Sequence, residues 1–485
     1  MKTRYVLFNW FYYAIVFVFF VFFFTRIHPI APFDSDDWSN MILERPSFPS
    51  LDCWNPTKVF PERFEPFVST IAGYLIVPLV GDYIGGLILA NSIVVAFFII
   101  IYLLFVHRYI ITRFQLNPLI CLALITIFIL LHFLILRTAE ECNEYLLYSN
   151  DSNCYYHYIM PNLLCASLVI WLMHHDIRIE SHGRTIATLL VFIYLALCSN
   201  LYSVTILISY IGSVLLIDLK TFSPSRSWLT SYIKRNAPFL IVIVLWVIIQ
   251  WIESNGIRAN CYGYLHKSFI RYLKETCKIF LTIRYNHWFL TFSILALVAA
   301  KLLKYRLKRY TRFWRISYHE WVVLLSLGLS IVYLILLSSR VNPTYVQRGD
   351  VIFEYAFFFL WMVIMALAYI CTHFRQASWV APLFILFLFF QSNTHGRTFK
   401  DVSEKYPPNI QCSIRLDQEI VTQIIDADAK GQDSVVINVP IYPYGENWPI
   451  MTPRHHSQYY GIALYKHNRT KREITTIFIP AYEIE

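Results

Sequence analysis

The sequence predicts a polytopic α-helical membrane protein that ends in a small α/β domain. Hydrophobic residues make up 57% of its 485 positions and charged residues only 15%, which is too apolar for an ordinary soluble domain. Most apolar residues are gathered in runs long enough to cross a bilayer, and these runs stop near Asn393. The formal net charge of +10 is expected to mark cytoplasmic loops rather than a nucleic-acid-binding surface.

The N-terminal segment predicts a retained membrane anchor. The apolar run from Tyr5 to Phe24 is longer than the apolar part of a signal peptide, and no small-x-small cleavage site follows it. We therefore expect the chain to begin on the cytoplasmic side of the membrane.

Apolar stretches of about 15 to 22 residues predict about eleven membrane spans. The fifth and sixth stretches are separated only by the short segment "CSNLYS", so the expected number ranges from nine to eleven. The expected spans lie near residues 6–24, 86–106, 118–136, 156–173, 186–199, 201–217, 237–252, 286–302, 320–338, 352–372 and 378–392.

Alternating loops are rich in lysine and arginine, which supports this topology. The most basic loop is "KLLKYRLKRYTRFWR", residues 301–315, and it is expected to be cytoplasmic. With an odd number of spans, the segment after the last one lies on the outer face. Residues 1–392 then form a transmembrane domain with a long, structured first outer loop at 25–85, and residues 393–485 form an outer α/β domain.

Local patterns predict the elements of these two outer regions. Residues 66–80 are apolar but too short to span, so we expect a helix that lies in the interface or re-enters it. In the last domain, Leu416, Ile420 and Ile424 have helical spacing. The segments "SVVINVPIY" and "EITTIFIPAY" are typical of strands.

An acidic cluster follows the first span directly. The segment "PFDSDDWSNM" contains Asp34, Asp36 and Asp37. One interpretation is a helix start, where acidic residues are favoured. The other is a catalytic carboxylate beside the lipid phase that takes a proton from a sugar hydroxyl, with its pKa tuned by the neighbouring acids.

Cations in later outer loops are candidates for binding a lipid phosphate. Arg340 and Arg348 flank the short turn "VNPTYVQ" at a helix mouth, where arginine can hold phosphate through paired hydrogen bonds. Lys58, Arg258 and Lys267 are further candidates. The alternative for the long loop after the seventh span is an interfacial helix whose cations reach to lipid headgroups.

Aromatic residues beside polar groups predict contacts with a sugar acceptor. The segment "WNPTKVFPERFEP" is expected to follow an extended path because of its three prolines. Its aromatic side chains either grip a sugar or anchor the loop among lipid headgroups, and those of the last domain either line a glycan path or pack in a core. The candidate acceptor-binding residues are Trp38, Trp54, Glu62, Tyr442 and Trp448.

Taken together, the acidic first outer loop, the many spans, the interfacial helix and the outer C-terminal domain resemble the GT-C superfamily of polyprenyl-phosphate-sugar-dependent glycosyltransferases. The segments "PFDSDDW" and "CWNPTKVFPERFEP" and the C-terminal tail more narrowly resemble phage-encoded serotype-converting O-antigen glucosyltransferases of enteric bacteria. The architectural likeness covers the whole chain, and the motif likeness covers mainly residues 30–67.

The resemblance implies a multi-pass enzyme of the bacterial inner membrane with its active site on the periplasmic side. Its donor is undecaprenyl-phosphate-glucose, made by a separate donor-lipid synthase and moved outward by a flippase. Its acceptor is the O-antigen repeat of lipopolysaccharide on its own lipid carrier. Some members of the superfamily use a divalent cation between acidic residues and phosphate; no metal ligands and no certain cofactor are predicted here.

The expected reaction is an inverting glucosyl transfer. Asp36 or Asp37 deprotonates the acceptor hydroxyl, which attacks C1 of the donor sugar while Arg340, Arg348 and Lys58 stabilise the departing phosphate. No nucleotide-binding glycine motif is present in the sequence, which fits a lipid-phosphate donor. The alternatives are a flippase or transporter of a lipid-linked saccharide, an O-antigen polymerase, or a scaffold without catalysis. Spans with few charged residues argue against a transporter.

Overall fold

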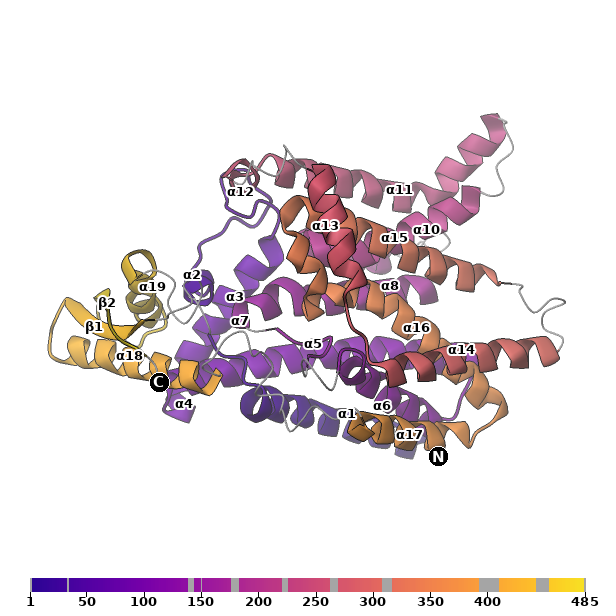
Figure 1. Cartoon of the computed structure of the whole chain (residues 1–485), viewed down its shortest axis with the longest axis horizontal. Helices are drawn as coiled ribbons and strands as arrows, with labels where there is room; N and C mark the ends of the chain where they lie inside the picture. The colour runs from indigo at the N-terminus through magenta and orange to yellow at the C-terminus, as the bar shows by residue number, and fades with distance from the viewer. Residues whose placement is uncertain are drawn as a thin grey trace.

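The computed structural model describes most of the chain, and Figure 1 shows it as a long helical bundle with a small unit at one end. The described residues are 2–32, 35–137, 144–149, 151–175, 183–219, 226–261, 269–307, 316–391, 410–441 and 453–483. Asp34, Lys267, Tyr442 and Trp448, four of the predicted site residues, lie outside these ranges.

Helices form nearly all of the first 391 positions that the structure describes. Those before residue 200 are α1 (Lys2–Phe22), η1 (Phe23–Ile27), α2 (Ser35–Asn40), α3 (Val59–Ile71), η2 (Ala72–Ile76), α4 (Val77–Val80), α5 (Tyr83–Phe114), α6 (Pro118–Leu134), α7 (Ser152–Cys154), η3 (Tyr155–Ile159), α8 (Met160–His174) and α9 (Gly183–Leu197). Those that follow are α10 (Leu201–Leu219), α11 (Arg226–Ser254), α12 (Ile257–Cys261), α13 (Phe269–Leu281), α14 (His287–Arg306), α15 (Tyr318–Val341), η5 (Pro343–Gln347), α16 (Gly349–His373) and α17 (Ala377–Gln391).

Nine helices in the described ranges are long and apolar enough to cross a membrane, which confirms a polytopic helical protein. Three further apolar helices are shorter, and they coincide with the predicted spans at 118–136, 186–199 and 378–392. The nine are Leu7–Ile27, Val59–Val80, Tyr83–Phe114, Ser152–His174, Leu201–Leu219, Trp228–Ser254, His287–Arg306, Tyr318–Val341 and Gly349–His373.

The segment that contains α3, η2 and α4 differs from the sequence prediction. The extended path expected through Pro61 and Pro66 is wrong, because a helix begins at Val59 and continues to Val80. Pro61 lies in the first turn, where a helix needs no backbone donor. Pro66 lies further along and removes only one backbone hydrogen bond of the helix. The resulting helix has 22 residues, which is long enough to cross a bilayer rather than only to lie in its interface.

The centre of the bundle is formed by the helices that bury the most surface. In the apolar windows of Ser152–His174 and Gly349–His373, 89% and 83% of the residues are buried. The corresponding values are 28% for Leu7–Ile27 and 17% for Trp228–Ser254, whose apolar side chains therefore face outward. Large apolar side chains exposed along a helix are expected where lipid replaces water.

The last two described ranges form a βαβ unit preceded by a helix. They contain α18 (Ile410–Ala429), β1 (Ser434–Ile441), α19 (Pro453–Lys466) and β2 (Thr475–Glu483). The strands pair in parallel, with Ser434 opposite Thr475. The predicted helix and both strands are confirmed, and Leu416, Ile420 and Ile424 are buried as their spacing predicts. Parallel strands need a crossover connection, and α19, which the sequence did not predict, supplies it.

This C-terminal unit packs against α2, η2 and the start of α5 (Figure 1). The Trp38 ring stacks on Tyr460 with 3.7 Å between ring centroids. The Tyr83 hydroxyl lies 2.6 Å from His467 Nδ1. A Cβ added to Gly73 would lie 2.5 Å from the His467 Cβ and 2.8 Å from the His467 carbonyl oxygen. Only glycine therefore lets η2 approach this backbone so closely.

Gly73→Ala is expected to lower the free energy of unfolding by about 1–3 kcal/mol, because its methyl group would push His467 and the C-terminal unit away. The matched control is Gly328→Ala in α15, where an added Cβ meets nothing within 4 Å. That variant is expected to be neutral or slightly stabilising. Thermal unfolding of both proteins in one detergent makes the measurement, and equal unfolding temperatures would contradict the close contact.

Candidate active site

The short helix α2 holds Asp37 against the start of the helix that runs from α7 into α8. Asp37 is fully buried, and its Oδ1 accepts hydrogen bonds from Ser152 Oγ at 2.8 Å and from the Asn153 backbone N–H at 2.5 Å. A carboxylate is favoured at a helix N-terminus, where backbone donors have no partner within the helix. Asp36, one residue earlier in the same turn, is exposed.

A second carboxylate, Asp151, lies at the same helix start. Its Oδ1 accepts a hydrogen bond from the Cys154 backbone N–H at 2.6 Å. Burial raises the pKa of Asp151 above its ordinary value, although this hydrogen bond and the Arg348 cation oppose the shift. Asp37 and Asp151 thus bind adjacent backbone donors of one helical turn.

Arg348 lies beside that turn and is held on several sides. Its Nη2 and Nε pair with the two Asp350 oxygens at 2.5 and 3.0 Å, and Nη2 also lies 3.1 Å from Cys154 Sγ. Its Cζ lies over the Tyr158 ring at 4.5 Å and over the Tyr345 ring at 5.1 Å. The side chain still has 32% of its surface exposed.

Charge on Arg348 is secured by its carboxylate partner. Burial of the guanidinium disfavours the charged form, but the Asp350 carboxylate together with the neighbouring Cys154 and Tyr158 holds the pKa of Arg348 well above its ordinary value. A bidentate pair of this kind also fixes the plane of the guanidinium, which orients its remaining donors.

Lys58 reaches the same aromatic ring from another part of the chain. Its Nζ lies 5.9 Å from the centroid of Tyr158. Desolvation and the neighbouring Arg258 cation lower the pKa of Lys58 to about 8, although Glu62 and Glu253 favour its charge. The structure therefore brings Lys58, Arg258 and Arg348, three of the predicted phosphate-binding residues, into one region.

Glu62, a predicted acceptor-binding residue, is buried among its own partners instead. Only 2% of it is exposed. Its Oε2 lies 3.0 Å from Arg45 Nε, its Oε1 accepts a hydrogen bond from Asn55 at 2.7 Å, and His157 Nε2 lies 3.8 Å away. Asn55 also accepts a hydrogen bond from Arg258 at 3.1 Å. Glu62 thus organises the loop that carries Lys58.

The other predicted residues lie apart from this cluster. Arg340 is exposed on the last turn of α15, and the described residues give it no ion pair. Trp54 is 46% exposed on the loop before α3. Trp38 is 1% exposed and packs on Tyr460 between α2 and α19, which fits a core residue rather than an open sugar platform.

Several residues of this region were not predicted as site residues. Glu65 is 1% exposed, both of its carboxyl oxygens lack a hydrogen-bond partner among the described residues, and Asp37 and Asp151 are its strongest electrostatic neighbours. The spacing of Glu62 and Glu65 was a usable signal, since residues three apart share a helix face. Nothing in the sequence indicates that two cations lie over the ring of Tyr158.

Another buried acid joins the site to the C-terminal unit. Asp417 Oδ1 accepts a hydrogen bond from the Tyr460 hydroxyl at 2.8 Å. Burial raises the pKa of Asp417 well above its ordinary value, and the nearby Asp37 charge adds to the shift. The described ranges contain no group of three histidine, cysteine or acidic side chains arranged to hold a metal ion, so no residue is assigned to a cation.

Comparison with known proteins gives no relative for this arrangement. No family model, curated protein or solved structure matches the chain. The geometry of the cluster formed by Asp36, Asp37, Asp151, Lys58 and Arg348 is therefore the basis for a functional assignment.

Proposed function

We propose that the protein transfers one sugar from a polyprenyl-phosphate donor to a saccharide hydroxyl at the membrane surface. A single observation carries the proposal: Asp37 and Arg348 bind the same helical turn, Ser152–Cys154, while Lys58 shares the Tyr158 ring with Arg348. Acidic groups that can accept a proton thus lie beside cations that can hold a leaving phosphate. The resemblance of the sequence supports undecaprenyl-phosphate-glucose as donor and the O-antigen repeat as acceptor, in the periplasm.

In the proposed reaction, Asp36 accepts the proton of the acceptor hydroxyl, and the resulting oxygen attacks C1 of the sugar. The new C1–O bond forms as the bond from C1 to the phosphate oxygen breaks, with inversion at C1. The lipid phosphate leaves with the electron pair, and Arg348 and Lys58 stabilise its charge. Asp37 acts as a positioning residue because its hydrogen bonds to Ser152 and Asn153 fix α2.

The test is reconstitution of the full chain in liposomes with radiolabelled undecaprenyl-phosphate-glucose and lipid-linked O-antigen repeats. Mass spectrometry is expected to show one added hexose per repeat and release of the lipid monophosphate. Joining of repeats without donor consumption would identify a polymerase instead. Movement of either lipid across the bilayer without transfer would identify a flippase, and either result would overturn the proposal.

Donor binding is expected to weaken as the pH rises through the pKa of Lys58, about 8. If only protonated Lys58 holds the donor phosphate, the KM for the donor rises about tenfold between pH 7 and pH 9. Lys58→Arg is expected to remove this dependence, because arginine stays charged over the whole range. The measurement is the initial rate of transfer at varied donor concentration and pH.

The pH dependence of stability provides a control, because it runs in the opposite direction to that of donor binding. The pKa of Lys58 lies below its ordinary value of 10.5, so between about pH 8 and 10.5 the unfolded chain binds more protons at this site than the folded chain. The contribution of Lys58 to the free energy of unfolding therefore rises with pH in that window. A wild-type KM that stays constant to pH 9.5 would contradict a role for the Lys58 charge.

A further inference from the structure

A large cavity lies at the opposite ends of the helices that form the candidate active site. Its volume is about 1230 Å³, and its lining residues come chiefly from the ends of α5 and α8, from α14 and α15, and from the second half of α16. Arg348 precedes the first residue of α16, whereas Tyr369 of the cavity lies 20 residues further along that helix. At 1.5 Å per residue the two sites are about 30 Å apart along the axis.

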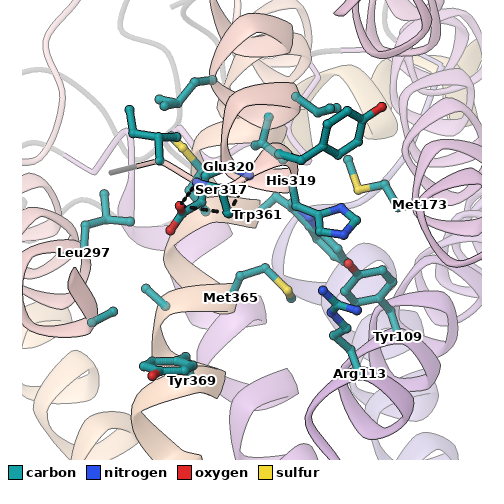
Figure 2. Close-up of a pocket in the computed structure, with 18 of the residues that line it drawn as sticks. Tyr109, Arg113, Met173, Leu297, Ser317, His319, Glu320, Trp361, Met365 and Tyr369 are labelled. Carbon is teal, nitrogen blue, oxygen red and sulfur yellow. Dashed lines mark hydrogen bonds between the residues drawn. The ribbon is translucent and has the colours of Figure 1, made fainter. Parts of the chain in front are cut away.

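The lining of this cavity contains both apolar and charged side chains. Leu297, Met173, Trp361 and Met365 contribute apolar surface (Figure 2). Its ionised side chains are three cations, Arg113, Lys301 and Lys304, against one carboxylate, Glu320. With His319 and His373 neutral, the cavity therefore carries a formal excess of two positive charges.

The single carboxylate is shared among several donors. Glu320 Oε1 lies 2.8 Å from Lys304 Nζ, and its Oε2 lies 3.5 Å from Lys301 Nζ and accepts hydrogen bonds from Ser317. Arg113, which lies near Tyr109 in Figure 2, has no ion pair within the described ranges. Three cations against one carboxylate give the lining a net positive formal charge, which favours an anionic ligand.

Two of the helices that line the cavity pack only loosely against each other. Helices α14 and α15 both pack on α16, but in the described part of the chain they do not pack closely on each other. Val298 of α14 and Leu324 of α15 both line the cavity, and they remain 44% and 37% exposed. This arrangement suits the sideways entry of a hydrocarbon chain between these two helices.

We propose that this cavity binds one anionic membrane lipid, with its phosphate attracted by the cations Arg113, Lys301 and Lys304 and a hydrocarbon chain along Trp361 and Met365. Three features together select this class of ligand. The positive formal charge selects an anion, the apolar side chains select a hydrocarbon chain, and the loose contact between α14 and α15 favours a molecule delivered from the bilayer. A free phosphate would use only the first feature, and a zwitterionic lipid only the other two.

The test is native mass spectrometry of the full chain released from nanodiscs that contain phosphatidylglycerol or phosphatidylcholine with identical chains. One phosphatidylglycerol per protein is expected to remain bound, and phosphatidylcholine is expected to be lost. In Lys301→Gln/Lys304→Gln the retention of phosphatidylglycerol is expected to fall about tenfold, since each cation near the surface contributes to the attraction of an anionic lipid. The matched control is Lys274→Gln/Lys278→Gln on α13, which is expected to retain the lipid normally.

Two further variants test the charge of the cavity and its apolar space one at a time. Arg113 is exposed, so Arg113→Gln is expected to fold normally and still to weaken retention. Met365→Trp fills the apolar part and is expected to displace the lipid without changing the charge. Equal retention of both lipids would overturn the proposal. Protection of the protein against unfolding by inorganic phosphate alone would also overturn it, and so would normal lipid retention in Arg113→Gln and Met365→Trp.

Discussion

Asp36→Asn is expected to lower the rate of sugar transfer by about 10²- to 10⁴-fold, because an amide cannot accept the proton of the attacking hydroxyl. Asp36 is exposed in the first turn of α2, so the free energy of unfolding is expected to change by no more than about 0.5 kcal/mol. The measurement is the initial rate in liposomes at saturating donor and acceptor, together with the unfolding temperature of the same preparation.

Asp37 provides the matched comparison, because it is the next residue and has a buried carboxylate. Asp37→Asn keeps an oxygen that accepts from Ser152 Oγ and Asn153 N–H, so we expect a folded protein and a smaller loss of rate than in Asp36→Asn. Asp37→Ala leaves these donors without their acceptor and is expected to cost about 1–3 kcal/mol of stability for each unsatisfied group. Inactive Asp37→Asn beside active Asp36→Asn would show that Asp37 is the base and that our assignment is wrong.

The membrane-spanning helices were predictable because length and composition alone determine them. A run of apolar residues long enough to cross a bilayer must become a helix there, since lipid offers no partner for backbone polar groups. The same logic failed for Val59–Val80, where the prolines concealed the helix start. Pro61 lies in the first turn, where proline is tolerated, and Pro66 lies inside the helix without ending it.

The C-terminal unit shows a second limit of local patterns. The strands and α18 carry their own signals, whereas α19 is amphipathic only weakly and gains its stability from contacts with β2 and α2. Its Tyr460 packs on Trp38, more than 400 positions earlier in the chain. Trp38 was therefore predicted as an acceptor-binding residue, because this partner cannot be recognised from the sequence.

The candidate site itself could be predicted as a list of residue types but not as an arrangement. Asp37, Lys58 and Arg348 were identified because acids and cations are unusual next to membrane spans. Their convergence depends on Tyr158 and on the turn at Ser152–Cys154, which have no distinguishing pattern in the sequence. Arg340 and Arg348 could not be told apart, because burial and the Asp350 partner exist only in the folded chain.

Arg348→Gln is accordingly expected to lower the rate of transfer by about 10²- to 10³-fold, the usual effect of removing one group that stabilises transition-state charge. Arg340→Gln, which removes the same charge from an exposed position on the other side of the same turn, is expected to change the rate less than about twofold. Rates at saturating donor and the KM for the donor distinguish loss of chemistry from loss of binding.

A structural role for Arg348 makes a different prediction, and the Asp350 partner allows the two to be separated. Arg348→Gln alone leaves Asp350, which is 2% exposed, without its cation, and breaking such a buried pair costs about 3–5 kcal/mol. In Arg348→Gln/Asp350→Asn both charges are gone and two amides replace the pair, so most of the stability is expected to return. Transfer stays low in the double variant if the guanidinium acts on the phosphate. Its recovery together with stability would show that Arg348 serves only to neutralise Asp350.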